Sequence, residues 1–476
     1  MVSHAFPKPL PSLPRLTLST TTRCAGLLLC LSGILRAADS PARDSGPVTL
    51  EWAYDRALAT DQGIRIAFYE VRKANLLPWS ALTRIGPQLS GNAGYTRREQ
   101  SSKSSGFDSG QSISADSLST SARVDRNTSN RTGNGSARLS FEQPLIDFTV
   151  FPAYRLGKIS AAVAKLQHQF TVRETLFGVA AAYYEVLKQQ RLVEVNRETL
   201  RLANQQLDLA QKRANVGEVT RSDVLRATVT VETARRTLVE SENVLALDRN
   251  TLGNILNFPT DAPYQIVEPP DYPGTLPPFP ELLSRAYAHR EDLRVKQLAI
   301  DQDTERRNEI IGEYGPRVVA QWDGGVAHTS GSSSTSNHDW QAAVAVQVPI
   351  LNGGQREIDL RTAGEQIQQT RLDLERTEKL VEADVKQAWL TVRSLQQTLK
   401  ALHAQVVAAE QGFHDLEHQY AAGTATSVDV LSALNDLNNA RKDLAVETYG
   451  YQVALRNLEQ TSGVFQDQRV KASKLR

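Results

Sequence analysis

The chain has 476 residues, of which 40% are hydrophobic, so it can fill two or three ordinary domains and is too apolar to be disordered throughout. Its formal charge is +1, and because residues 1–37 carry four basic residues and no acid, the remainder carries −3. Such a chain lacks the basic surface of a nucleic-acid-binding protein, so we expect no nucleic-acid partner.

Residues 1–37 have the features of a secretory signal peptide. An apolar run, Ala25–Leu35, follows a basic start and precedes small residues that place cleavage near Ala37. The chain's two cysteines, Cys24 and Cys30, both fall within this segment, and neither follows a small residue, which disfavours lipidation. We therefore expect an exported protein without disulfides.

Two segments predict leading helices that resemble each other. Residues 49–82 and 281–313 both have apolar side chains at helical spacing. The stretch that begins at Arg56 (Arg-Ala-Leu-Ala) aligns with the stretch that begins at Arg285 (Arg-Ala-Tyr-Ala), a shift of 229 positions. The repeated pattern is the first sign of an internal duplication.

After each leading helix the period of the apolar residues changes to two, which is typical of strands. The predicted strands are about 87–97 and 136–144 in the first half and about 316–328 and 339–349 in the second. Polar, Ser-rich segments, 97–135 and 329–338, are expected as the loops between them. Each strand has about the length of a tilted transmembrane strand, whereas no apolar run outside the signal approaches the ~20 residues of a spanning helix. A soluble antiparallel sheet is the alternative.

Two very long helices follow the strands. Residues 154–216 and 355–421 are helical in pattern and almost free of Gly and Pro. More than sixty residues at ~1.5 Å each predict rods of roughly 90–100 Å. Shorter returning helices are expected at 220–257 and 427–461. Small and apolar side chains form a packing seam on each rod: Leu200, Ala203, Leu207, Ala210 and Ala214 on the first, and Leu395, Leu399, Leu402, Val406 and Ala409 on the second.

Each rod ends in a similar tight turn, at tips 215–223 and 421–430. In both, a glycine is followed six residues later by Asp-Val-Leu: Gly217 in the first copy and Gly423 in the second, 206 positions later. Glycine favours the positive φ that follows a helix C-terminus. One copy alone would indicate an ordinary helical hairpin, but two copies indicate a duplicated chain.

The chain is thus expected to comprise five parts. These are a signal peptide (1–37), a first repeat (38–258), a Pro-rich connector (259–280), a second repeat (281–464) and a C-terminal tail (465–476).

This order of elements, with the paired Gly…Asp-Val-Leu tips, resembles the TolC family of outer-membrane efflux proteins over essentially the whole mature chain. The resemblance implies a mainly α fold with a small β part. In that family three protomers form one 12-stranded β-barrel in the outer membrane, which an α-helical coiled-coil tunnel continues into the periplasm. The implied function is that of a passive channel in tripartite efflux or type I secretion. The implied partners are a periplasmic adaptor, an inner-membrane transporter and outer-membrane lipid, and neither an enzymatic activity nor a cofactor is implied.

Strand pairing requires several chains independently of the resemblance, which implies that the number is three. Four strands in one protomer leave open edges, and an open edge in lipid leaves backbone hydrogen-bonding groups unpaired. Closure therefore requires several chains, and a ring of 12 strands is wide enough for a conduit.

The resemblance also assigns roles to the tips. Adaptor docking would involve Gly217, Val219, Thr220 and Ser222 in the first tip and Gly423, Ala425, Thr426 and Ser427 in the second. The entrance gate would involve Asp223, Tyr420 and Asp429. Some members close the entrance with a Tyr and an Arg that bond the first tip's Asp; Tyr420 and Asp223 match that pair, but Ala425 stands at the Arg position. Three copies of Asp429 would form an anionic ring that favours cations. Alternatively, both aspartates serve as first-turn helix caps.

Two other functions remain to be weighed against a channel. A periplasmic coiled-coil scaffold outside the membrane would use the strands as a soluble sheet. A metal-dependent enzyme would require bound metal, and the sequence offers only His414 and His418, four residues apart, with Glu417 beside them. This is not the H-E-x-x-H motif, and a solvated helix face explains it more simply, so we assign no metal site from the sequence.

Overall fold

The computed structural model describes residues 47–107, 123–259, 263–270, 276–331 and 334–472. The expected signal peptide, residues 1–37, lies outside the described residues, as do parts of the connector and of the C-terminal tail. The chain divides into two units, residues 1–47 and 48–476, and all the helices and strands described below belong to the second.

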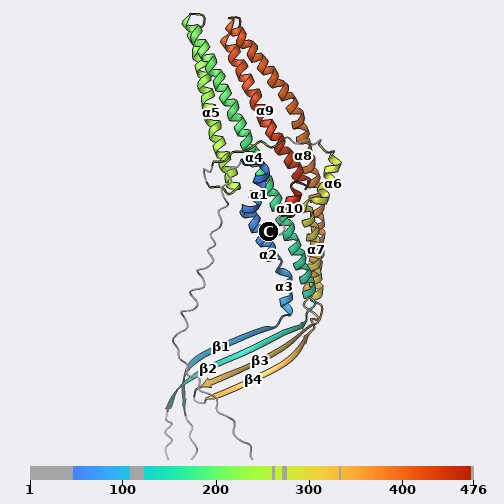
Figure 1. The fold of residues 1–476 in the computed structure, drawn as a ribbon. Helices are drawn as coiled ribbons and strands as arrows, with labels where there is room; N and C mark the ends of the chain where they lie inside the picture. Colours follow the sequence, from blue (N-terminus) through green and yellow to red (C-terminus); the bar gives the residue numbers. More distant parts are fainter. Residues whose placement is uncertain (1–46, 108–122, 260–262, 271–275, 332–333, 473–476) are drawn as a thin grey trace, which may run out of the picture. The chain divides into compact units, whose positions relative to one another are not determined.

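The second unit contains the same series of elements twice (Figure 1). The first series comprises α1 (Leu50–Thr60), α2 (Gln62–Ala74), α3 (Leu77–Leu82), the short helix η1 (Thr83–Ile85), β1 (Gln88–Phe107), β2 (Arg123–Ile146), α4 (Val150–Asn215) and α5 (Arg221–Ile255). The second comprises α6 (Phe279–His289), α7 (Glu291–Gly312), β3 (Arg317–Ser330), β4 (Thr335–Gln347), α8 (Gln355–Ala421) and α9 (Ser427–Thr461), and α10 (Asp467–Ala472) follows it. The duplicated order expected from the sequence is confirmed.

Each leading helix is interrupted where the sequence predicts a continuous one. Asp61 separates α1 from α2 with an extended backbone (ψ 130°), and its side chain accepts a hydrogen bond from the backbone N–H of Ile64 at 2.8 Å. Arg290 separates α6 from α7 with nearly the same backbone (ψ 125°). Asp61 and Arg290 are 229 positions apart, the same shift that aligns the two sequences. Helical spacing continues across both breaks, so the apolar pattern alone could not reveal them.

The four strands form one antiparallel sheet in the order β1-β2-β3-β4. The strands of the two repeats therefore join directly through β2 and β3, and β1 and β4 are the two edges. β1 and β2 extend well beyond the expected strands 87–97 and 136–144 into the polar segment expected as a loop. This expectation was wrong because backbone pairing in an antiparallel ladder does not depend on the apolar side chains that the prediction followed.

The register places most of the large apolar residues of the four strands on one face of the sheet. Across the strands, Leu89 pairs with Phe141, Phe141 with Trp322, and Trp322 with Ala342. Directly paired residues of an antiparallel sheet point to the same side, so these rows share a face. The neighbouring row of Ser90, Ser140, Asp323 and Gln341 lies on the opposite face. The sheet is therefore amphipathic.

The long helices form the scaffold that carries the tips. α4 has 66 residues, about 99 Å at 1.5 Å per residue. It packs against α5 toward the tip, against α1, α2 and α3 toward the sheet, and against α7 and α9 of the second repeat (Figure 1). The expected seams face inward, with Ala203, Ala210 and Leu402 buried. Among the described residues no helix is both long and apolar enough to cross a membrane.

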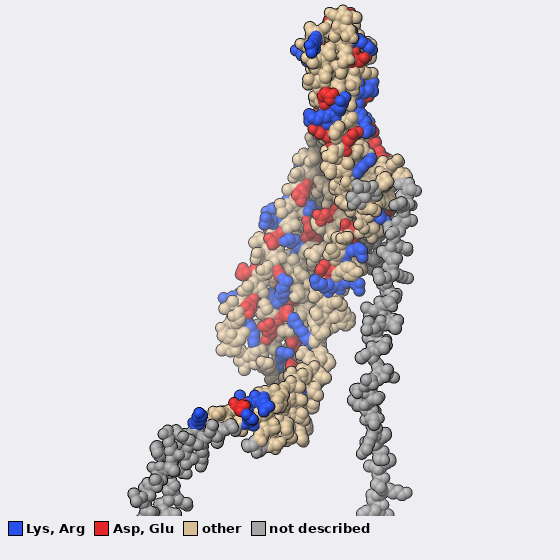
Figure 2. Space-filling view, turned by 90° about the vertical axis from the view of Figure 1, so that its left-hand side faces the viewer, with Lys and Arg blue, Asp and Glu red and all other residues tan. Residues whose placement is uncertain are grey.

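Charged residues are distributed over the helical part without segregation by sign. Figure 2 shows Lys and Arg interspersed with Asp and Glu along the face in view. Many of these groups are paired on one helix at i,i+3 or i,i+4 spacing, as for Arg201 with Glu198 at 2.6 Å and Arg236 with Glu240 at 2.6 Å. Such pairs are typical of solvated helix surfaces.

Candidate functional site: the two hairpin tips

The two tips have the same backbone geometry. Gly217 has φ +79° and Gly423 has φ +81°, and both follow directly on the end of a long helix. The N–H of Gly217 donates to the carbonyl of Ala214 at 3.0 Å, and that of Gly423 to the carbonyl of Tyr420 at 3.0 Å. A side chain at a positive φ is strained, which explains why glycine recurs at this position.

Asp223 and Asp429 both cap the helix that leaves their tip. The Thr220 hydroxyl donates to Oδ2 of Asp223 at 2.7 Å, and the Thr426 hydroxyl donates to Oδ2 of Asp429 at 2.6 Å. The backbone N–H of each threonine donates to the same carboxylate oxygen, at 3.1 and 3.0 Å. Each pair forms a capping box, so the capping role considered for both aspartates is confirmed.

Asp223 has a second interaction that Asp429 lacks among the described contacts. Ser427, the first residue of α9, donates its hydroxyl hydrogen to Oδ1 of Asp223 at 2.7 Å. This bond joins the second hairpin to the first. The hydrogen bond from Ser427, followed by those from Thr220, lowers the pKa of Asp223 below its ordinary value. The charged carboxylate is therefore the form that holds the two tips together.

Arg213 and Tyr420 form a second contact between the hairpins. The Arg213 guanidinium lies over the Tyr420 ring, with Cζ 4.7 Å from the ring centroid, and donates through Nη1 to the Tyr420 carbonyl. Its Nε donates to Glu218 at 2.9 Å, within the first tip. Tyr420 is only 3% exposed, so this cation–π contact is largely shielded from water. Burial raises the pKa of the Tyr420 hydroxyl.

The expected hydrogen bond between Tyr420 and Asp223 is not formed. In the part of the chain that the structure describes, the buried Tyr420 hydroxyl has no hydrogen-bond partner. The oxygens of Asp223 accept instead from Ser427 and Thr220. The two residues that the resemblance pairs are thus both at the junction of the hairpins, but each binds a different neighbour.

An apolar cluster lies beneath these polar contacts. It combines residues of both hairpins: Ala203, Val231 and Ala234 from the first, and Phe413, Tyr420, Val430, Leu434 and Leu437 from the second. The packing fixes the backbone positions from which Ser427 and Arg213 reach across. The apolar core and these two polar contacts therefore hold the tips together, and further along the rods Gln206 bonds Glu417 and Thr199 bonds Asn438.

The expected docking residues differ in their accessibility. Gly217, Thr220, Ser222, Gly423 and Thr426 are exposed. Val219 and Ala425 are half-buried, and Ser427 is 8% exposed because it faces Asp223. Most of the set is thus accessible from solvent, whereas Ser427 makes the contact between hairpins.

The sequence analysis missed Arg213 and the inter-hairpin role of Ser427. Aligned by the shift of 206, Arg213 corresponds to Gln419 and Ser427 corresponds to Arg221. The two copies therefore differ at the residues that join them. Comparison of the copies for differences, as well as for shared motifs, would have provided this signal.

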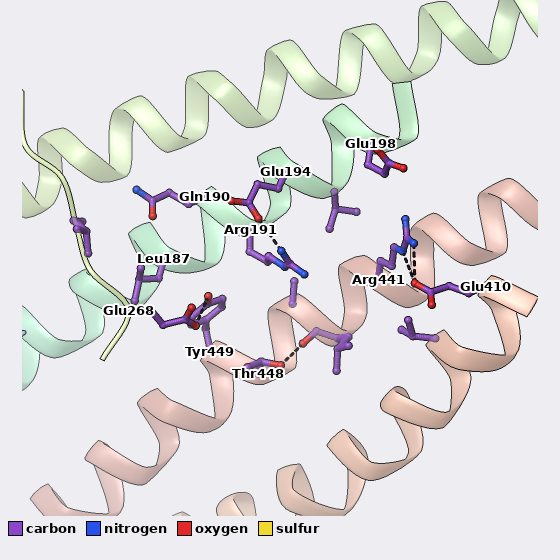
Figure 3. A pocket seen from close by; sticks show the side chains of 15 residues that line it. Leu187, Gln190, Arg191, Glu194, Glu198, Glu268, Glu410, Arg441, Thr448 and Tyr449 are labelled. Carbon is purple, nitrogen blue, oxygen red and sulfur yellow. Dashed lines mark hydrogen bonds and ion pairs between the residues drawn. The ribbon is translucent and has the colours of Figure 1, made fainter. Parts of the chain in front are cut away.

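A groove of about 860 Å³ lies away from the tips, among α4, α8, α9 and the connector (Figure 3). Its charged side chains are engaged with one another: Arg191 with Glu194 at 2.8 Å and Arg441 with Glu410 at 2.7 Å. Glu268 accepts a hydrogen bond from the Tyr449 hydroxyl at 2.9 Å. The described charged side chains named here are thus paired, and the tips remain the candidate site.

Known proteins resemble this chain in sequence. The profile of the family described as "Outer membrane efflux protein" matches residues 53–257 and 282–464, one segment in each repeat. The chain is 24% identical to the outer membrane protein TolC of Escherichia coli over 360 residues, 70% of each protein. It is 22% identical to the proteases secretion protein PrtF of Dickeya chrysanthemi over 348 residues, 70% of this chain and 74% of PrtF.

Solved structures show the same fold. The Campylobacter jejuni CmeC outer membrane channel superposes with a TM-score of 0.69 at 14% identity, over 90% of this chain and 89% of CmeC. The outer-membrane channel OprN superposes with a TM-score of 0.68 over 87% of this chain and 89% of OprN. Because the family profile covers most of both repeats, the chain belongs to the outer membrane efflux protein family.

Proposed function

We propose that three copies of this chain form a channel in the outer membrane, with the helical part in the periplasm, that passively conducts substrates from a periplasmic adaptor and an inner-membrane transporter to the exterior. Such a channel serves efflux or type I secretion. Family membership supports this function, and so do the secretion and channel roles in the names of PrtF and CmeC.

The amphipathic sheet is the observation that carries the proposal. No described part of the chain covers its apolar face: Trp340 is 74% exposed and Val344 is 67% exposed. A soluble protein would bury such a face against a second layer. Lipid on the apolar face and water on the polar face suit the sheet as it stands, because strands of an outer-membrane barrel alternate apolar-out and polar-in.

The free edges of the sheet support the homotrimer. β1 and β4 each pair on one side only, so each has a row of backbone groups that needs a partner in lipid. Pairing of β1 from one copy with β4 from the next satisfies both rows. Three copies then give a closed ring of 12 strands, whose interior is wide enough for a conduit.

The tips provide the gate and the adaptor surface in this proposal. At rest, the Ser427–Asp223 and Arg213–Tyr420 contacts hold the second hairpin against the first and narrow the entrance. An adaptor that docks on the exposed tip residues, such as Gly217 and Gly423, moves the second hairpin outward and breaks both contacts. Open glycine positions allow close approach of another backbone.

Asp429 gives the entrance its selectivity. Its side chain is exposed at the second tip, and the Thr426 hydrogen bonds lower its pKa, so it is charged at neutral pH. Three copies around a threefold axis form an anionic ring. Asp429→Asn should lower the cation-to-anion permeability ratio in planar bilayers, whereas Asp436→Asn, exposed on the same helix, should leave it unchanged.

The experiment that tests the function is cell fractionation followed by reconstitution. A channel appears in the outer-membrane fraction as heat-modifiable trimers, and the purified protein produces discrete conductance steps in planar bilayers. Release of the protein by osmotic shock, together with the absence of conductance steps, would instead support the periplasmic scaffold.

A further inference from the structure

His414 and His418 lie one turn apart on α8, close to the second tip, and their rings face each other. Their Nε2 atoms are 3.1 Å apart and their ring centroids 4.3 Å apart. Both side chains are exposed on the helix surface. Spacing of i,i+4 allows such a meeting, but the side chains must also turn their Nε2 atoms toward each other, and here they do.

The two Nε2 atoms lie within hydrogen-bond distance of each other, and the same separation suits two ligands of a shared metal ion. Imidazole nitrogens bind Zn²⁺ at about 2.0–2.1 Å, and two such ligands at an angle between about 90° and 109° are about 2.9–3.4 Å apart. The observed 3.1 Å falls within that interval. Chelation would therefore need little rearrangement of either side chain.

Glu417 orients the first of the two histidines. Its Oε2 lies 3.7 Å from Nδ1 of His414, on the side of the ring opposite to the facing Nε2. At 3.7 Å this is an ion-pair distance and not a hydrogen bond, so the carboxylate acts on the His414 ring through its charge. Carboxylate support of this kind is common among metal-binding histidines.

Glu417 also connects the pair to the first hairpin. Its Oε1 accepts a hydrogen bond from Nε2 of Gln206 on α4 at 3.0 Å. Gln206 is itself only 4% exposed, and its Oε1 has no hydrogen-bond partner in the described structure. The carboxylate thus has a fixed position, held from the neighbouring rod, before any metal binds.

We infer that His414 and His418 form a binding site for a divalent transition-metal ion, Cu²⁺ or Zn²⁺, with Glu417 as its positioning residue. Imidazole ligands suit these ions, and of the two Cu²⁺ binds the more tightly. Among the described residues no third His, Cys, Asp or Glu side chain joins the pair in a group that could hold a metal ion, so the proposed site has two protein ligands. The site does not depend on conduction through the channel.

The test is titration of the purified mature chain, made without a histidine tag, with CuCl₂. We expect one Cu²⁺ per chain by calorimetry and an electron paramagnetic resonance spectrum with two nitrogen ligands. His414→Ala and His418→Ala should each weaken binding at least about tenfold, and Glu417→Gln should weaken it about tenfold while both nitrogens remain in the spectrum.

His403→Ala is the matched control. His403 is exposed on the same helix, with its Nδ1 beside the Leu399 carbonyl at 2.7 Å, and lies well away from the pair. Its replacement should leave the affinity unchanged. The inference is overturned if the unaltered chain binds no stoichiometric Cu²⁺, if the spectrum shows a single nitrogen, or if the double variant His414→Ala/His418→Ala binds as tightly as the original. Circular dichroism of each variant confirms that the helices are retained.

Discussion

Ser427 on the second hairpin donates a hydrogen bond to Asp223 on the first, and the two residues are 204 positions apart in the chain. The other oxygen of Asp223 caps its own helix. A single carboxylate thus stabilises the start of α5 and the contact between the tips. Any movement that separates the hairpins must break the Ser427–Asp223 bond and can leave the Thr220–Asp223 bond intact.

Ser427→Ala should favour the open entrance. One lost hydrogen bond is worth about 1 kcal/mol, which changes a closed-to-open ratio about fivefold. We expect a higher mean conductance in planar bilayers and no loss of trimer. Ser432→Ala, a matched change at an exposed serine of the same helix, should behave as the unaltered channel. Equal conductance of all three proteins would show that Ser427 does not help to close the entrance.

Tyr420→Phe and Arg213→Gln should differ in their effect on conductance. The Tyr420 hydroxyl has no partner among the described residues, so its removal should leave both conductance and stability nearly unchanged. Arg213→Gln removes the guanidinium from the ring and from the carbonyl, and places at this position the residue found at 419 in the second copy. Conductance should rise. A rise in the conductance of Tyr420→Phe would instead support the hydrogen bond from Tyr420 to Asp223 that the resemblance implies.

Acid should open the entrance, because the pKa of Asp223 is lowered in the folded protein by Ser427 and then by Thr220. A carboxylate with a lowered pKa contributes its full stabilisation above its ordinary pKa of about 3.9 and loses it as pH falls through the lowered value. Conductance should therefore be constant from neutral pH to about pH 4 and rise below it. Asp223→Asn should conduct at neutral pH as the unaltered channel does in acid. A pH response that persists unchanged in Asp223→Asn would have another origin.

The two faces of the sheet should respond differently to a charge. Val344→Arg places a cation on the apolar face, at a cost of about 2–4 kcal/mol near the bilayer midplane. Ala343→Arg places the same cation on the polar face, one residue away. We expect heat-modifiable trimers in the outer membrane for Ala343→Arg and a marked loss of them for Val344→Arg. Equal yields would indicate that neither face contacts lipid.

The sequence predicted the order of the repeated elements and missed the exact ends of some of them. Alternation of apolar residues located all four strands, but it could not show that β1 continues through polar residues to Phe107. Helical spacing located both rods and both leading helices. In the leading helices, however, the spacing continues across the breaks at Asp61 and Arg290, so it did not reveal them. These errors share a cause: the pattern of apolar residues does not report either feature. Strand pairing uses backbone groups that every residue carries, and a helix break depends on one or two residues.

At the tips, local chemistry was predictable and contact across the hairpins was not. A Thr three residues before an Asp indicates a helix cap, and both caps are present. The contact of Arg213 with Tyr420 depends on how two rods pack, over a separation of 207 residues. No local pattern encodes it. Only the difference between the two copies, Arg213 against Gln419, carries information about it.

Cross-linking between the edge strands tests the closed ring most directly. Cysteine placed on β1 by Ala93→Cys is combined in turn with His338→Cys, Trp340→Cys, Ala342→Cys and Val344→Cys on β4, and each protein is oxidised in isolated outer membranes. Because β1 of one copy should pair with β4 of the next, at least one combination should give a ladder of products that ends at three times the mass of the chain. Products confined to a single chain in all four combinations, or a ladder that ends at two, would contradict the trimeric channel.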